Sequence, residues 1–118
     1  MGEDNQAKPK SLFLKISGNP MDHPGSLEGL RCARGFAADG RWRVTVEICS
    51  ECVEYFIETQ ENLQGTGFTS IEELSGLVRF VIASNSISRT SAIPDWIHPL
   101  TTDEALLLGL AADVVLMF

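Results

Sequence analysis

Two cysteines separated by two residues are the most chemically suggestive feature of the sequence. The motif Cys49-Ser50-Glu51-Cys52 follows a segment whose apolar residues alternate like a strand, and it precedes a segment with helical spacing. Cys49 is therefore expected at a strand end, and Cys52 in the first turn of the next helix. The amino end of a helix stabilises a thiolate and lowers its pKa, as a redox-active or sulfur-carrying cysteine requires.

The same two cysteines also fit a purely structural role. Glu47, Glu51 and Glu54 lie close by in the sequence, and their charges would raise a thiol pKa. Thioredoxin-type motifs lack such acidic surroundings, and a free cysteine often packs as a small hydrophobic residue. The sequence therefore leaves two interpretations of Cys49 and Cys52 open, a reactive pair and two ordinary half-buried thiols.

Other chemistries have less support. Zinc prefers four Cys or His ligands, and only Cys49, Cys52 and His23 are expected to converge, with His98 distant. The sequence contains no G-x-G-x-x-G, Walker, G-x-S-x-G or H-E-x-x-H motif. We therefore expect no metal site and no cofactor.

Polar residues follow two further predicted strands. In a parallel sheet the carboxyl ends of the strands share one edge, where ligands bind. The turn after the third strand would offer hydroxyls and backbone N–H groups to an anion, or would be an ordinary polar cap. The candidate ligand-binding residues at this edge are Asn19, His23, Ser84, Asn85, Ser86 and Arg89.

Alternating strand and helix patterns predict the elements that position these residues. We expect strands at 11–17, 42–48, 77–83, 96–98 and 114–118, the second of them near a sheet edge. Ser26 is expected to cap a helix that ends at Gly40, and Thr101 with Glu104 matches a capping box. The fold class is α/β, a single three-layer, flavodoxin-like domain over 11–118 after a flexible lead-in of residues 1–10. Its five-stranded, mainly parallel sheet is expected in the order 2-1-3-4-5, with helices on both faces.

Composition and charge favour one cellular compartment and disfavour some classes of binding partner. The net charge of −7 disfavours nucleic acid, and no apolar run reaches the roughly 20 residues of a membrane span. Three cysteines in a chain without an export signal favour reduced thiols and the cytoplasm. The segment Ala105–Ala112 is apolar all round, and Gly29, Cys32 and Phe36 form a second patch on the first helix. We expect a homo-oligomer, the alternative being helices buried in their own monomer.

The sequence also resembles the DsrE/DsrF-like family of small sulfur-relay proteins over about Leu12–Phe118. The resemblance is carried by S-L-E-G-L-R-C-A at 26–33, V-T-V at 44–46, F-V-I-A-S-N-S at 80–86, and the ending from Asp103 to Phe118. It implies a five-stranded parallel sheet and trimers or hexamers, formed with itself or with related subunits. Some members carry a persulfide on a cysteine ending the third strand, where this sequence has Ala83 followed by Ser84.

Two functional hypotheses follow from the residues and the resemblance together. The first is a DsrE-like oligomeric protein that serves sulfur relay as a non-catalytic partner or small-ligand-binding subunit, which the absence of a cysteine at Ala83 favours. The alternative is a sulfur-transfer or redox protein whose catalytic thiols are Cys49 and Cys52.

Overall fold

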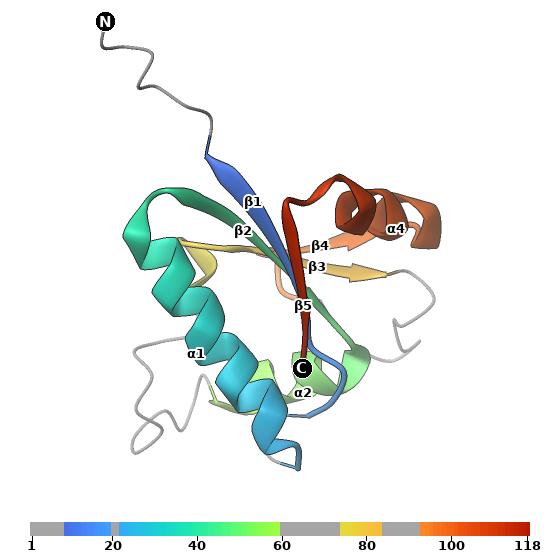
Figure 1. Cartoon of the computed structure of the whole chain (residues 1–118). Helices are drawn as coiled ribbons and strands as arrows, with labels where there is room; N and C mark the ends of the chain where they lie inside the picture. Colours follow the sequence, from blue (N-terminus) through green and yellow to red (C-terminus); the bar gives the residue numbers. More distant parts are fainter. Residues whose placement is uncertain (1–8, 20–21, 60–73, 84–92) are drawn as a thin grey trace, which may run out of the picture.

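The computed structural model describes residues 9–19, 22–59, 74–83 and 93–118 (Figure 1). Within them, strands alternate with helices as expected from the sequence, except between β3 and β4, where residues 84–92 are not described. The predicted lead-in falls mostly outside these residues. The elements are β1 (Lys10–Lys15), α1 (Pro24–Asp39), β2 (Trp42–Ile48), α2 (Ser50–Thr59), β3 (Arg79–Ala83), β4 (Ile97–Leu100), α4 (Thr102–Ala111) and β5 (Val114–Met117).

The five strands form one sheet in the order β4-β3-β2-β1-β5, and every neighbouring pair is parallel. The α/β class and the parallel sheet are confirmed, but the expected order 2-1-3-4-5 is wrong. Three successive crossovers step in one direction across the sheet, and the last one returns to place β5 beside β1. Because crossovers are right-handed, this reversal puts α4 on the face opposite α1. Hydrophobic patterns mark strands but do not show which crossover reverses.

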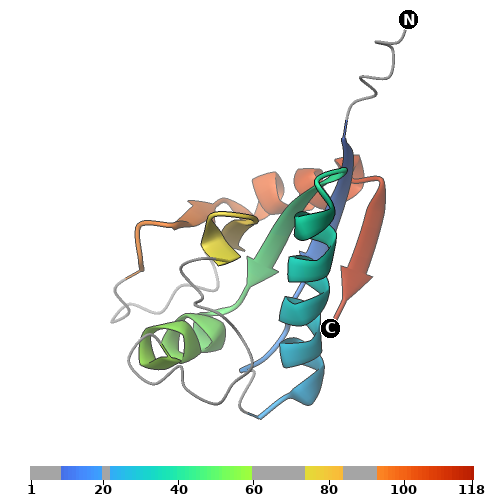
Figure 2. The same ribbon diagram turned by 90° about the vertical axis from the view of Figure 1, so that its left-hand side faces the viewer.

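Strand β2 lies at the centre of the sheet, so its predicted place near an edge is also wrong. Val44, Val46 and Ile48 are fully buried, whereas Thr45 and Glu47 between them are half-buried. The alternation arises because the two faces of the sheet are covered unequally. Helices α1 and α2 pack on the face of Val44, which we call the α1 face, and α4 partly covers the other, the α4 face (Figure 2).

The main core lies between the sheet and the helices on the α1 face. Its largest members are fully buried, and Phe80, the second residue of β3, contacts the ring of Trp96 edge-on, with 5.4 Å between centroids. On the opposite face, Phe13 is buried beside Gly109 of α4. The sheet is therefore anchored on both faces.

The helix ends follow local sequence signals, with one correction. Gly40 ends α1 in the left-handed conformation, with φ 81°, and Thr101 and Glu104 form both hydrogen bonds of the predicted capping box. However, α1 begins at Pro24 with His23 as its N-cap, not Ser26. Proline is favoured in the first turn because it lacks the N–H that would stay unpaired there. Ser26 is instead buried in that turn, where its N–H donates to the His23 carbonyl at 2.9 Å.

The two apolar surfaces that the sequence marked for assembly differ in the structure. On α1, Gly29 lies against the ring of Phe118, and Phe36 contacts Trp42 edge-on at 5.0 Å between centroids. Cys32 also packs against the core. Neighbours within the same chain therefore explain that patch.

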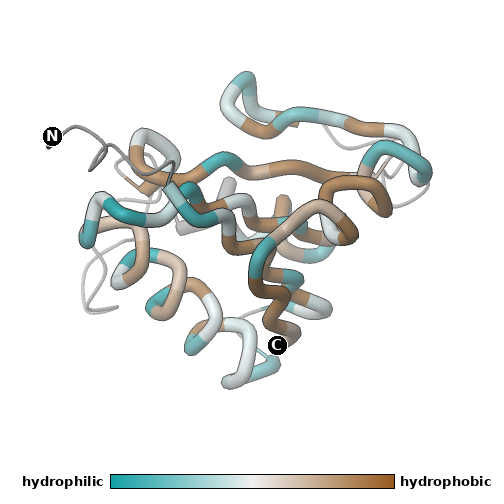
Figure 3. The backbone as a smooth tube through the Cα atoms, turned by 45° about the horizontal axis from the view of Figure 1, so that its top comes forward, coloured by the Kyte–Doolittle hydropathy of each residue, from teal (hydrophilic) through white to brown (hydrophobic). Residues whose placement is uncertain are grey.

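Helix α4 differs, since Ala105 is its single buried residue within this chain. Exposed fractions reach 61% for Leu106, 63% for Leu107 and 74% for Leu110. The nearby strand β5 exposes Met117 at 69%, and the chain is coloured hydrophobic up to its C-terminal end in Figure 3. The expectation that α4 is buried on more than one side is therefore not met within a single chain.

Among the described residues, no helix is both long and apolar enough to cross a bilayer.

Candidate functional site

Cys49 occupies the junction between the central strand and the helix that follows it. It comes directly after Ile48, the last residue of β2, and directly before Ser50, the first residue of α2. Its carbonyl accepts hydrogen bonds from the N–H groups of Cys52 at 3.0 Å and Val53 at 3.3 Å. The half-buried Cys49 side chain therefore lies at the positive end of a ten-residue helix.

Cys52, one turn later, faces the core and is fully buried. Its thiol donates to the carbonyl of Gly18 at 3.0 Å, which joins α2 to the loop after β1. The two cysteines are thus unequal: Cys49 is accessible, whereas Cys52 is enclosed.

The environment of Cys49 favours its thiolate. A hydrogen bond from the Cys52 side chain is the largest cause that lowers the pKa of Cys49, from 9.0 to about 6. Backbone N–H groups of Cys52 and Glu51 lower this pKa further, whereas partial burial and the Glu51 charge raise it. The like-charge effect expected from acidic neighbours is therefore present, but hydrogen bonding outweighs it.

The other two cysteines favour their neutral thiols. The hydrogen bond with Cys49 and burial both raise the pKa of Cys52, while burial raises that of Cys32. Cys52 has a single S–H proton, which the Gly18 carbonyl and the Cys49 sulfur both attract. When Cys49 is ionised, the neutral Cys52 thiol can act as its donor.

A cavity of about 670 Å³ opens beside Cys49 on the α4 face of the sheet. Ile48 pairs with Ile82, so Cys49 and Ala83 are the next residues of two adjacent strands, and both line the cavity. Lys15 and Glu47 line it as well and form an ion pair at 3.9 Å. Its remaining wall is largely apolar and includes Phe13, Ala105, Leu106, Gly109, Leu110, Val115 and Met117.

The other predicted site residues are only partly placed. Asn19 accepts at its carbonyl from the N–H groups of Asp22 and His23, both at 2.9 Å. The His23 ring packs so closely on Gly18 that a Cβ there would collide with it. Neither Asn19 nor His23 lines the cavity. The remaining predicted ligand-binding residues, Ser84, Asn85, Ser86 and Arg89, lie outside the described residues.

The described residues offer no candidate metal site. Within the described ranges, no group of three or more His, Cys, Asp or Glu side chains is placed to hold an ion. His98 lies on β4, away from the two cysteines, and lines a different cavity.

Comparison with known proteins adds evidence for the fold. No family model matches the sequence, and no curated protein does. Among solved structures, the crystal structure of the ychN protein from E. coli is similar, with a TM-score of 0.67 over 92% of this chain and 99% of that chain. This chain therefore shares the fold of that protein. At 18% identity the likeness concerns the fold and not the activity.

Sequence reasoning missed the residues that surround Cys49 on the α4 face. Lys15 and Glu47 are direct partners in the β1–β2 register, and Met117 pairs with Lys15 across β1 and β5. Side chains two residues apart on a strand share a face. The alternation in β2 places Glu47 and Cys49 on one face, and the expected order already set β1 beside β2. The contributions of β3 and β5 to this site followed only from the correct strand order.

Proposed function

We propose that this DsrE-like protein is a thiol-based sulfur carrier in which Cys49 is the reacting thiol and Cys52 its buried hydrogen-bond donor. The observation that carries the proposal is the place of Cys49 at the carboxyl edge of the sheet. There it combines partial exposure, a helix amino end and a cavity. Ala83, the position where the family resemblance expects a persulfide cysteine, lines the same cavity from the adjacent strand. The reacting thiol would thus reach the same cavity from the end of β2 and not from the end of β3.

The proposed transfer needs no oxidant or reductant. The Cys49 thiolate attacks the outer sulfur of a donor persulfide, R–S–SH, and forms a new S–S bond. The donor's S–S bond breaks, its electron pair leaves with R–S⁻, and the outer sulfur keeps its proton. Cys49 then carries a persulfide, which an acceptor thiolate removes by the same exchange in reverse. A donor hydrogen bond from Cys52 stabilises Cys49 both as attacking thiolate and as leaving group.

Mass spectrometry after incubation with a low-molecular-weight persulfide donor tests this proposal. The wild-type chain is expected to gain about 32 Da, the mass of one sulfur atom, on the peptide that contains Cys49. Cys49→Ser should abolish the adduct, whereas Cys32→Ser, which removes a thiol of raised pKa on α1, should leave it unchanged. An adduct that survives in Cys49→Ser, or that forms equally on Cys32, would contradict the proposal.

A second proposal concerns assembly, and the exposed apolar side chains of α4 and β5 support it. Leu106, Leu110 and Met117 are exposed and also rim the Cys49 cavity. Large contiguous apolar surfaces on a folded chain mark interaction sites. We propose that a second copy of this chain covers the surface, as in the trimers or hexamers implied by the resemblance. If the chain assembles but does not transfer sulfur, its role is that of a non-catalytic partner subunit.

Leu110→Glu tests the assembly because it adds a charge to the centre of that surface. Sedimentation of the wild-type chain is expected to give a multiple of the 12.9 kDa chain mass, and the variant to shift toward one chain. Burial of an unpaired carboxylate at an interface costs roughly several kcal/mol of free energy. Ala38→Glu, at an exposed position of α1, is the matched control and should keep the wild-type mass. A wild-type mass equal to one chain would reject the homo-oligomer.

A further inference from the structure

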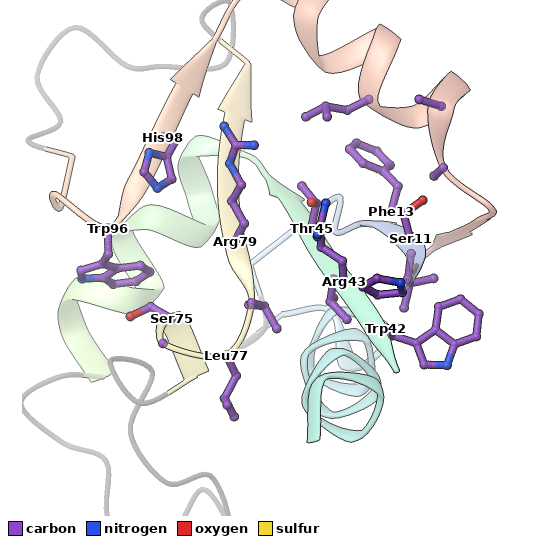
Figure 4. Close-up of a pocket in the computed structure, with 18 of the residues that line it drawn as sticks. Ser11, Phe13, Trp42, Arg43, Thr45, Ser75, Leu77, Arg79, Trp96 and His98 are labelled. Atoms are coloured by element: carbon purple, nitrogen blue, oxygen red, sulfur yellow. The ribbon is translucent and has the colours of Figure 1, made fainter. Parts of the chain in front are cut away.

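A second cavity lies at the opposite end of the sheet from Cys49. It has a volume of about 760 Å³, within the usual range of small-molecule sites. It opens on the part of the α4 face that α4 leaves uncovered, near the amino ends of the strands (Figure 4). The residues that line it include Ser11, Phe13, Trp42, Arg43, Thr45, Arg79, Asp95, Trp96 and His98.

Two arginines from adjacent strands face this cavity. Arg79 on β3 pairs in register with Thr45 on β2, so Arg43 lies one strand over and two residues back on the same face. Strand spacing of about 4.8 Å and a rise of about 3.3 Å per residue place their backbones roughly 8 Å apart. Two side chains as long as arginine can meet on one bound group across that distance.

Neither arginine is neutralised by the protein within the described part of the chain. Arg31 pairs with Glu28 and Arg41 with Asp39, whereas Arg43 and Arg79 form no ion pair there. Both are exposed to solvent. Although the chain has a net charge of −7, these two unpaired guanidinium groups make the surface locally positive.

The Lys10 ammonium adds positive charge near the cavity, and two tryptophan rings add flat apolar walls. The Lys10 ammonium lies 5.9 Å from the centre of the Trp42 ring, and His98 follows on β4. Asp95 is the carboxylate that lines the cavity. Nearby Asp113 is held by Ser11, whose N–H donates to it at 2.7 Å.

We propose that this cavity binds a small molecule through an oxyanion group, phosphate or carboxylate, held by Arg43 and Arg79. The planar guanidinium presents paired N–H donors that match either oxyanion. Trp42 and Trp96 would flank the rest of the ligand. The site is independent of the proposed thiol function, since its residues lie at the other end of the strands.

Intrinsic fluorescence provides the test, because the chain has two tryptophans and both line the cavity. Inorganic pyrophosphate and citrate are titrated separately at constant ionic strength. At least one is expected to give a saturable change, and the anion that binds identifies the oxyanion as phosphate or carboxylate. Arg43→Gln and Arg79→Gln should each weaken binding about tenfold or more, as expected for loss of a charge-assisted hydrogen bond.

Arg34→Gln is the matched control, since it removes the same charge from an exposed position on α1. It should bind as the wild type does, and Arg79→Lys, which keeps the charge but not the paired donors, should bind with intermediate affinity. Circular dichroism checks that each variant is folded. Failure of both anions to bind, or equal weakening in Arg34→Gln, would overturn the site. So would a change of sedimentation mass in Arg43→Gln without a change in anion binding, which would assign the cavity to a subunit contact.

Discussion

Alkylation of Cys49 by iodoacetamide is expected to reach half its plateau rate near pH 6 and to change little above about pH 7. Cys32, whose pKa burial raises above 9.0, should instead react faster up to the most alkaline pH measured. A thiol of pKa 6 is about 90% ionised at pH 7, and one of pKa 9 about 1%. A thiolate of low pKa is also a weaker nucleophile, which reduces the advantage at neutral pH. The ratio of the two rates should therefore increase as the pH is lowered, and at pH 6 Cys49 is expected to react at least about tenfold faster than Cys32.

Cys52→Ala isolates the cause of this behaviour. The hydrogen bond from Cys52 is the largest contribution that lowers the pKa of Cys49, so its removal destabilises the thiolate. The midpoint of the Cys49 profile should move to higher pH, toward the ordinary cysteine value. Cys52→Ser keeps a donor at the same position and should shift the midpoint less.

Peptide mass spectrometry across a pH series follows each cysteine in the same sample, so Cys32 is an internal control. A wild-type midpoint of about 8.5 or above would show an ordinary thiol at Cys49. An unchanged midpoint in Cys52→Ala would show that the helix amino end, and not the Cys52 thiol, sets the reactivity.

Phe80→Ala is expected to lower the free energy of unfolding by about 3–5 kcal/mol. The Phe80 side chain on β3 is fully buried, and its removal leaves a cavity and ends the ring contact with Trp96. Edge-on aromatic pairs contribute about 0.5–1.5 kcal/mol beyond buried area. Domains of this size have total stabilities of roughly 5–15 kcal/mol, so the variant should approach the limit of folding.

Urea denaturation followed by circular dichroism measures this loss. Phe80→Leu, which refills most of the cavity, should lose less stability and keeps the experiment informative if the alanine variant does not fold. Leu77→Ala is the matched control, because Leu77 lies close by in the chain but is 54% exposed. A loss below about 1 kcal/mol in Phe80→Ala, the size typical of an average substitution, would contradict the assigned core.

Much of the secondary structure followed from local patterns. The range of β2 matches its alternating segment, and Gly40 and the Thr101–Glu104 capping box end and begin the predicted helices. These features depend on residues within a few positions of one another, because backbone conformation and capping are local effects. Class α/β and a parallel sheet followed from the alternation of such elements.

The order of the strands did not follow from the same patterns. The hydrophobic pattern of a strand does not depend on its position in the sheet. The alternation in β2 therefore predicts an edge position, although the strand is central. Three of its seven residues are polar because α4 covers its second face only in part. Similarly, no local pattern links Arg43 with Arg79, which lies on the next strand and is its neighbour in space.

By itself the sequence determined which segments become strands and helices, that the sheet is parallel, and that a C-x-x-C pair sits at a strand-to-helix junction. Only the tertiary structure decided which strands are neighbours. It thereby placed Cys49 beside Ala83 at one end of the sheet, and Arg43 near Arg79 at the other. The physical reason is the range of the interactions. Turns and helix ends are set by adjacent residues, whereas strand order is set by packing between residues far apart in the chain.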